Sequence, residues 1–123
     1  YENVASVSAL VTRMRKVDCA PSDGRKIAAA MERPDVAPHI AAWADTVAEG
    51  LASLIHIFDP AAVVIGGGFI EDARILALIR SHMQQHIAPG FHAPLLPAPH
   101  GNKAGLIGAA LLAQQHFKAA PEA

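Results

Sequence analysis

Residues 58–68 read FDPAAVVIGGG, and this stretch decides how the chain must fold. Asp59-Pro60 ends the helical pattern before it, because a residue that precedes proline avoids the helical region. Residues 61–65 are apolar and rich in β-branched side chains, without polar alternation, which predicts a parallel strand covered on both faces. The three glycines then turn the chain. A strand of this kind needs neighbouring strands on both sides.

The longest helix is predicted directly before this stretch. We expect Asp35 to cap it, Pro38 to lie in its first turn, and Asp59 to end it after about 22 residues, or roughly 33 Å. Its apolar stripe consists of Ile40, Trp43, Val47, Leu51, Leu54, Ile55 and Phe58. This periodicity is the clearest in the sequence and predicts a helix that faces a core.

Two shorter helices are expected nearer the N-terminus. The first is indicated by apolar residues at helical spacing, namely Val4, Val7, Val11 and Met14. The pattern breaks over residues 18–23, where Ser22 or Asp23 can cap a second short helix that ends at Pro34. The apolar residues of this second helix are Ile27 and Met31.

After the glycines, the sequence predicts a helix, a weak strand and a final helix. Glu71 and Asp72 suit the positive N-terminus of the first of these helices. Its apolar residues are Ile75, Leu76, Ile79, Met83 and Ile87. Residues 91–99 contain three prolines, so this strand should lie at an edge or pair only in part. The last helix is expected over residues 103–117, followed by a frayed tail at 119–123.

This order of elements indicates an α/β fold with an incomplete sheet. Five helices are expected around only two strands, yet the strand at 61–65 needs neighbours on both sides. The missing strands must come from outside these residues. We therefore expect residues 1–118 to be part of a larger domain.

Composition excludes several classes of protein. The 123 residues are 52% hydrophobic and 17% charged, with a net charge of −1. No basic excess points to nucleic acid or to a membrane surface, and no apolar stretch reaches the roughly 18 residues of a membrane span. Cys19 is the only cysteine, so it cannot form an internal disulfide and is expected to be a small residue near a loop. We expect a cytoplasmic protein.

Three features could carry chemistry. Gly66, Gly67 and Gly68 follow a strand, where glycines either let a ligand approach the backbone or simply form a tight turn. Residues 101–110 contain small residues that either let a helix pack closely on its neighbour or form a loop that touches nucleotide. His82 and His86 lie four residues apart on a helix, but no third ligand is evident, so no metal site is expected.

Three stretches in this order resemble the ROK family, a group of repressors and sugar kinases. Residues 2–10 (ENVASVSAL) resemble the segment that follows the family's zinc-binding cysteines. Residues 58–68 resemble the family's helix, Asp-Pro, strand and glycine turn. Residues 101–110 (GNKAGLIGAA) resemble its C-terminal helix, although His100 stands where many members have leucine. The resemblance extends from Glu2 to about residue 115.

The resemblance implies the C-terminal part of an actin-like, ribonuclease-H-like kinase domain that binds sugar and ATP in a cleft. Glu2 matches a glutamate that hydrogen-bonds the sugar. Gly66, Gly67 and Gly68 match the turn that lines the adenosine side of the nucleotide site. The family's catalytic aspartate, phosphate loop and structural zinc site lie upstream, so no catalytic or metal-binding residue is expected in this chain. Magnesium and ATP are expected in the full-length protein.

Three interpretations of function remain open. The first is a part of an ATP-dependent hexose or N-acetylhexosamine kinase, inactive by itself. The second is a part of a sugar-sensing repressor of the same family, for which DNA would be a partner. The third is a helical interaction module that dimerises through the stripe at residues 40–58. A homodimer without membrane contact is expected for the family.

Overall fold

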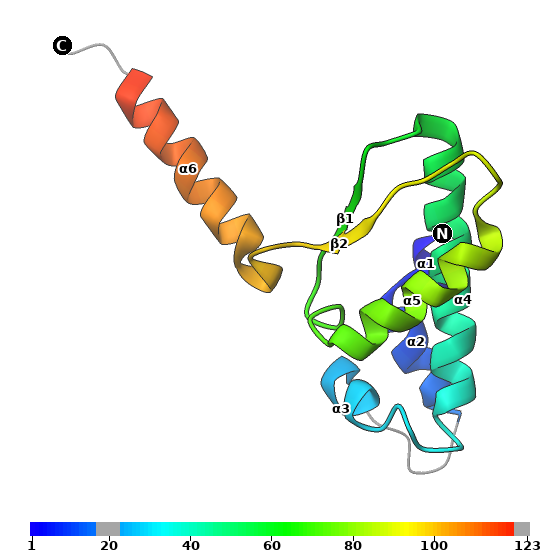
Figure 1. The fold of residues 1–123 in the computed structure, drawn as a ribbon. Coiled ribbons are helices and arrows are strands. Elements are labelled where there is room, and N and C mark those ends of the chain that lie inside the picture. The colour runs from blue at the N-terminus through cyan, green and yellow to red at the C-terminus, as the bar shows by residue number, and fades with distance from the viewer. Residues whose placement is uncertain (17–22, 120–123) are drawn as a thin grey trace.

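The computed structural model describes residues 1–16 and 23–119 (Figure 1). In chain order its elements are α1 Glu2–Ala5, α2 Val7–Met14, α3 Gly24–Ala29, α4 Ala37–Phe58, β1 Val63–Ile65, α5 Ala73–His86, β2 Leu95–Pro97, the 3-10 helix η1 Gly101–Lys103 and α6 Ala104–Ala119. The expected helix-rich α/β class with two strands and an incomplete sheet is confirmed. Cys19, Ser22 and, apart from Ala119, the expected tail lie outside the described residues.

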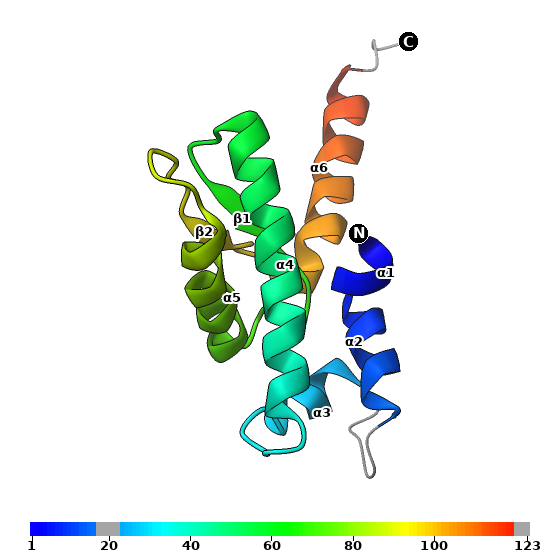
Figure 2. The same cartoon turned by 90° about the vertical axis from the view of Figure 1, so that its right-hand side faces the viewer.

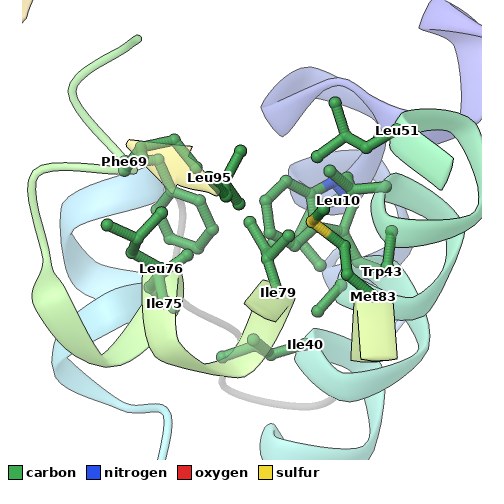
Figure 3. Packing of buried hydrophobic residues seen from close by; sticks show 14 of the residues in the cluster. Leu10, Ile40, Trp43, Leu51, Phe69, Ile75, Leu76, Ile79, Met83 and Leu95 are labelled. Atoms are coloured by element: carbon green, nitrogen blue, oxygen red, sulfur yellow. The ribbon is translucent and has the colours of Figure 1, made fainter. Parts of the chain in front are cut away.

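α4 is the central helix of the structure. In Figure 2, α5 lies on one side of it and α1 and α2 lie on the other. Figure 3 shows the core between these helices, to which α2, α4, α5 and β2 contribute. Its largest fully buried side chains are Leu10, Met14, Ile27, Val36, Ile40, Trp43, Ile55, Ile75 and Ile79. Burying each large aliphatic side chain contributes about 1.5–3 kcal/mol, so this cluster is the main stabilising feature.

The stripe on α4 is covered within the chain. Five of its members are buried: Ile40, Trp43, Val47, Leu51 and Ile55. Only Leu54 and Phe58 are exposed, at 46% and 70%. The interpretation of this chain as a module that dimerises through the stripe is therefore wrong, because α1, α2 and α5 already occupy most of it.

The start of α4 differs from the expectation. The N-cap is Val36 rather than Asp35, and no side chain caps the helix. A preceding turn explains this, because the amides of Val36 and Ala37 already donate to the carbonyl of Arg33. Asp35 instead binds the Arg33 guanidinium. The predicted length of 22 residues is confirmed, and Asp59 ends the helix in the left-handed conformation.

The first helix is broken in two, whereas one continuous helix was expected. Ser6 is extended, with φ −72° and ψ 156°, and lies between α1 and α2. Its hydroxyl accepts a hydrogen bond from the amide of Ala9 at 3.1 Å, which satisfies a free donor of α2. This local capping competes with helix continuation. Asp23, one of the two residues expected to cap the next helix, is the N-cap of α3.

β1 and β2 pair in parallel, with Val63 opposite Leu95 and Ile65 opposite Pro97. The amide of Val63 donates to the carbonyl of Pro94, and the amide of Ala98 donates to that of Ile65. The expected burial of β1 on both faces is wrong for the described residues, because Val64 is 61% exposed. A two-stranded sheet supplies no layer to cover it.

α6 extends away from the other elements (Figure 1). Leu106 and Phe117 on this helix are 74% and 83% exposed. The expected close packing of its small residues is not found in the described part of the chain, since nothing lies within 4 Å of a Cβ built on Gly105 or Gly108. Its helix was predicted correctly, but the surface that would cover it is not among these residues.

Candidate functional site

Glu2 lies on the exposed surface of α1, at the rim of a polar hollow. The hollow has a volume of about 380 Å³ and is formed by one face of α1 and α2. Its lining residues are Glu2, Asn3, Ser6, Ser8, Ala9, Thr12 and Arg13. The bend at Ser6 brings the polar sides of the two helices together around this hollow. A surface rich in hydroxyl, amide and carboxylate groups suits a polyhydroxylated ligand.

α1 is held against α4 at both ends. The Tyr1 hydroxyl donates to the carbonyl of Val47 at 2.9 Å. The Trp43 indole N–H donates to the carbonyls of Ala5, at 2.9 Å, and Ser6, at 3.2 Å. Partial burial raises the pKa of Tyr1, and the negative charge of Glu49 adds to this effect.

Gly66, Gly67 and Gly68 turn the chain at the carboxyl end of β1. Gly67 has φ +121°, which side chains rarely adopt, and a Cβ there would meet no atom of the chain within 4 Å. A Cβ on Gly66 would lie 3.3 Å from that of Ala98. Both explanations offered for the glycines are therefore compatible with Gly67. Its positive φ suits a tight turn, and its open side leaves room for a ligand.

A second hollow lies beside this turn. It has a volume of about 510 Å³ and is lined by Val7, Asp23, Gly24, Arg25, Gly68 and Phe69. Val7 lines this hollow, and its sequence neighbours Ser6 and Ser8 line the polar hollow, so both hollows include residues from the start of α2. The first is polar, and the second combines glycine backbone and the apolar side chains of Val7 and Phe69 with the charged residues Asp23 and Arg25.

Phe69 connects the glycine turn to Trp43, which holds the end of α1. Its ring is 6% exposed and meets that of Trp43 edge-on, with centroids 5.1 Å apart and an interplanar angle of 74°. Aromatic pairs favour this arrangement. One buried residue, Trp43, thus supports both the segment that carries Glu2 and the segment that follows Gly68.

Asp72 and Arg74 form an ion pair near the turn. Asp72 caps α5 and binds the Arg74 guanidinium, with Nη2 at 2.7 Å from Oδ2. Hydrogen bonds from this guanidinium lower the pKa of Asp72. Arg74 also donates to the carbonyl of Ala28 at 3.1 Å. This network joins α3 to the start of α5 and fixes the loop that follows the glycines.

His82 and His86 both contact one carboxylate, which sequence reasoning missed. Asp45 Oδ1 lies 3.0 Å from His82 Nδ1 and 2.7 Å from His86 Nε2. Hydrogen bonds from the two imidazoles, with that of His86 first, lower the pKa of Asp45. The partner lies 37 residues before His82, so only the packing of α4 on α5 brings it there.

Within residues 1–16 and 23–119, no group of three or more His, Cys, Asp or Glu side chains is arranged to hold a metal ion. Among the same residues, no helix combines the length and apolar character needed to cross a membrane.

The curated proteins that match this chain include sugar kinases. The β-glucoside kinase of Klebsiella pneumoniae is 41% identical over 70 residues, which cover 57% of this chain and 23% of that protein. The glucokinase of Streptomyces coelicolor is 39% identical over 80 residues, which cover 62% of this chain and 24% of that protein. The chain thus spans about a quarter of the length of these curated relatives.

A solved structure shows the same arrangement. The ROK family glucokinase from Streptomyces griseus, in complex with glucose and AMPPNP, superposes with a TM-score of 0.81 at 31% identity. The match covers 93% of this chain and 44% of the glucokinase. The sequence also matches the model of the ROK family over residues 1–116. This chain therefore belongs to the ROK family.

Proposed function

We propose that this chain is the part of an ATP-dependent hexose or N-acetylhexosamine kinase that faces the sugar and the adenosine. The observation that carries the proposal is that consecutive residues at the start of α2 line two unlike hollows, Ser6 and Ser8 the first and Val7 the second. The polar one carries Glu2, and the other is lined by Gly68 and Phe69. A kinase has to hold its two substrates side by side, and the relatives named above are sugar kinases.

The reaction is the transfer of the γ-phosphoryl group of ATP to a sugar hydroxyl. The hydroxyl oxygen forms a bond to the γ-phosphorus, its proton passes to a base, and the bond to the β,γ-bridging oxygen breaks to release ADP. Such transfer depends on positioning and on stabilising charge. Magnesium, when bound, neutralises charge on the phosphates. No residue of this chain matches the family's base or phosphate loop.

Within this reaction, the chain's own residues have a positioning role. The Glu2 carboxylate accepts a hydrogen bond from a sugar hydroxyl and fixes the ring beside the nucleotide. The backbone at Gly67 and Gly68 passes close to the adenosine, and the open side of Gly67 supports this placement. Phe69 stays in the core below the turn and keeps it in place. These tasks need geometry rather than chemical reactivity.

The proposal is tested with the full-length protein from which this chain comes. ADP release is measured with ATP and a panel of hexoses and N-acetylhexosamines. A kinase turns over at least one sugar well above the rate without sugar. Tight sugar binding without turnover, together with sugar-dependent DNA binding, would favour the repressor interpretation and refute the kinase. A winged-helix segment upstream of the sugar domain would support the repressor as well.

We further propose that the full-length protein is a cytoplasmic homodimer. This chain has one cysteine, Cys19, and so no internal disulfide, which is in keeping with a reducing compartment. Light scattering of the purified full-length protein gives the mass directly, and a monomeric mass at micromolar concentration would refute the dimer.

A further inference from the structure

The Tyr1 ring packs directly against Gly50 of α4, and we call this contact the seat of Tyr1. It is the strongest feature that the proposed function leaves unexplained. Gly50 lies in the middle of α4, where alanine would be the better helix former. A Cβ at this position would overlap the Tyr1 ring, whose Cε2, Cζ and hydroxyl oxygen all lie within van der Waals contact of that point. The ring therefore rests directly on the backbone of α4, although Tyr1 as a whole is 66% exposed. A glycine at this place has a packing reason.

The Tyr1 hydroxyl completes this seat. It donates to the carbonyl of Val47, which lies one turn before Gly50 on the same helix. The ring is thus fixed by a hydrogen bond at its tip and by contact along its face. Tyr1 is also the N-cap of α1, and its carbonyl accepts the amides of Val4 and Ala5 at 3.0 Å. The first turn of α1 starts from a residue that is held on α4.

The opposite end of α1 is fixed by Trp43. The carbonyls of Ala5 and Ser6 belong to the last turn of α1 and to its end, where helix carbonyls lack partners within the helix. The buried indole N–H supplies a donor to both. A helix of only four residues is not stable by itself, so these two attachments determine where α1 lies.

We infer that Tyr1, Gly50 and Trp43 are positioning residues for the sugar, acting through Glu2. This inference rests on the proposed function of Glu2. Glu2 directly follows Tyr1, so a shift of the Tyr1 ring moves the Glu2 backbone and redirects its carboxylate. Displacements near 1 Å at a site of this kind can reduce catalysis by as much as about 100-fold. Affinity for the sugar then depends partly on Gly50, which does not line the polar hollow.

A positioning role of Gly50 and a general structural role predict different behaviour of Gly50→Ala. Gly50→Ala improves the helix propensity of α4 while it removes the seat of Tyr1. The melting temperature of the variant is therefore expected to be unchanged or higher. Its affinity for the sugar should nevertheless fall by about tenfold, and its affinity for ATP should stay the same. A purely structural role would instead lower stability and affect both ligands.

A double-mutant cycle in the full-length protein tests this coupling. Glucose and ATP affinities are measured by calorimetry for wild type, Gly50→Ala, Tyr1→Ala and the double variant. We expect Gly50→Ala to weaken glucose binding in the wild-type background and to have no further effect once Tyr1 is alanine. Tyr1→Phe keeps the ring on Gly50 and should retain most of the affinity. Ser53→Ala, an exposed change on the same helix, should bind both ligands like wild type.

Glu2→Gln is the reference variant. It separates the proposed role of Glu2 in sugar binding from the inferred positioning role of Tyr1 and Gly50. Unchanged glucose affinity in Glu2→Gln would refute the proposed role of Glu2. Weaker binding in Glu2→Gln, with wild-type binding in Gly50→Ala and Tyr1→Ala, would leave that role intact and overturn the inference. Equal losses for glucose and ATP in Gly50→Ala, with a lower melting temperature, would overturn it too. Tyr1→Ala keeps the test decisive if Gly50→Ala fails to fold, because Tyr1 is mostly exposed.

Discussion

Asp45 on α4 and His86 on α5 are joined by a 2.7 Å hydrogen bond between Oδ1 and Nε2. His82, one turn earlier, reaches the same oxygen at 3.0 Å. One carboxylate thus links two positions of α5 to the central helix. The contact lies at the margin of the core rather than inside it, since Asp45 is half exposed.

This relationship predicts a pH-dependent contribution to stability. The imidazoles lower the pKa of Asp45 from its ordinary value of 3.8. The stabilisation is therefore present above about pH 4 and is lost as the pH falls through the lower pKa of the folded state. Asp45→Asn should lower the melting temperature at pH 7, and its difference from wild type should shrink below about pH 4.

The measurement is thermal unfolding of the full-length protein at several pH values between neutral and acid. Asp59→Asn is the matched control, because it changes an exposed carboxylate at the end of the same helix, and asparagine tolerates the left-handed conformation found there. A difference for Asp45→Asn that stays constant from pH 7 to pH 3 would contradict this account.

The second prediction concerns Glu2. Glu2→Gln in the full-length protein should weaken sugar binding by about 1.5–3 kcal/mol, because a hydrogen bond to a charged group contributes that much. The dissociation constant for the sugar, measured by calorimetry, should rise at least tenfold while that for ATP stays unchanged. Glu32→Gln, at an exposed carboxylate outside the polar hollow, is the control. Equal sugar affinities for wild type and Glu2→Gln would rule out the assigned role.

The third prediction separates two reasons for a glycine at position 67. Gly67 and Gly90 both have positive φ, +121° and +97°, and a Cβ on either meets nothing within 4 Å. Alanine at either position should therefore destabilise the protein by about 1 kcal/mol or more through backbone strain. Only Gly67→Ala should also raise the apparent ATP constant, by several-fold, with sugar affinity nearly unchanged.

Gly90 is the matched control because it lies beyond the far end of α5, away from the turn. Nucleotide affinity and melting temperature are measured on both variants. If Gly67→Ala and Gly90→Ala lose stability equally and bind ATP alike, the turn needs glycine for its φ alone, and the nucleotide role is refuted.

Local patterns predicted the elements of this fold, but not the surfaces that cover them. The periodicity of α4 and the run before Gly66 located the longest helix and the first strand. The prediction that Asp35 caps α4 was wrong, because the amides of Val36 and Ala37 already donate to the carbonyl of Arg33 in a preceding turn. The exposure of Val64 and of α6 was missed because burial depends on neighbours that these residues do not include.

The candidate site was likewise predicted only in part. Glu2 came from the family resemblance alone. The glycine turn stood out in the sequence as a tight turn or a ligand site, and the resemblance added its nucleotide role. The contacts of Tyr1 with Gly50 and of Trp43 with Ala5 join residues that are far apart in sequence. The only signal for them in one sequence is a glycine inside an otherwise strong helix, which usually has a packing reason.

The central claim is that this chain supplies binding geometry while the reacting groups of the kinase lie outside it. The most direct test compares this chain with the full-length protein in one coupled ADP-release assay, with ATP, magnesium and a panel of hexoses. The account predicts sugar-dependent turnover by the full-length protein and only background release by this chain, because loss of the base and phosphate loop removes most of the acceleration. Clear sugar-dependent turnover by this chain alone, or none by the full-length protein with any of the sugars, would contradict it.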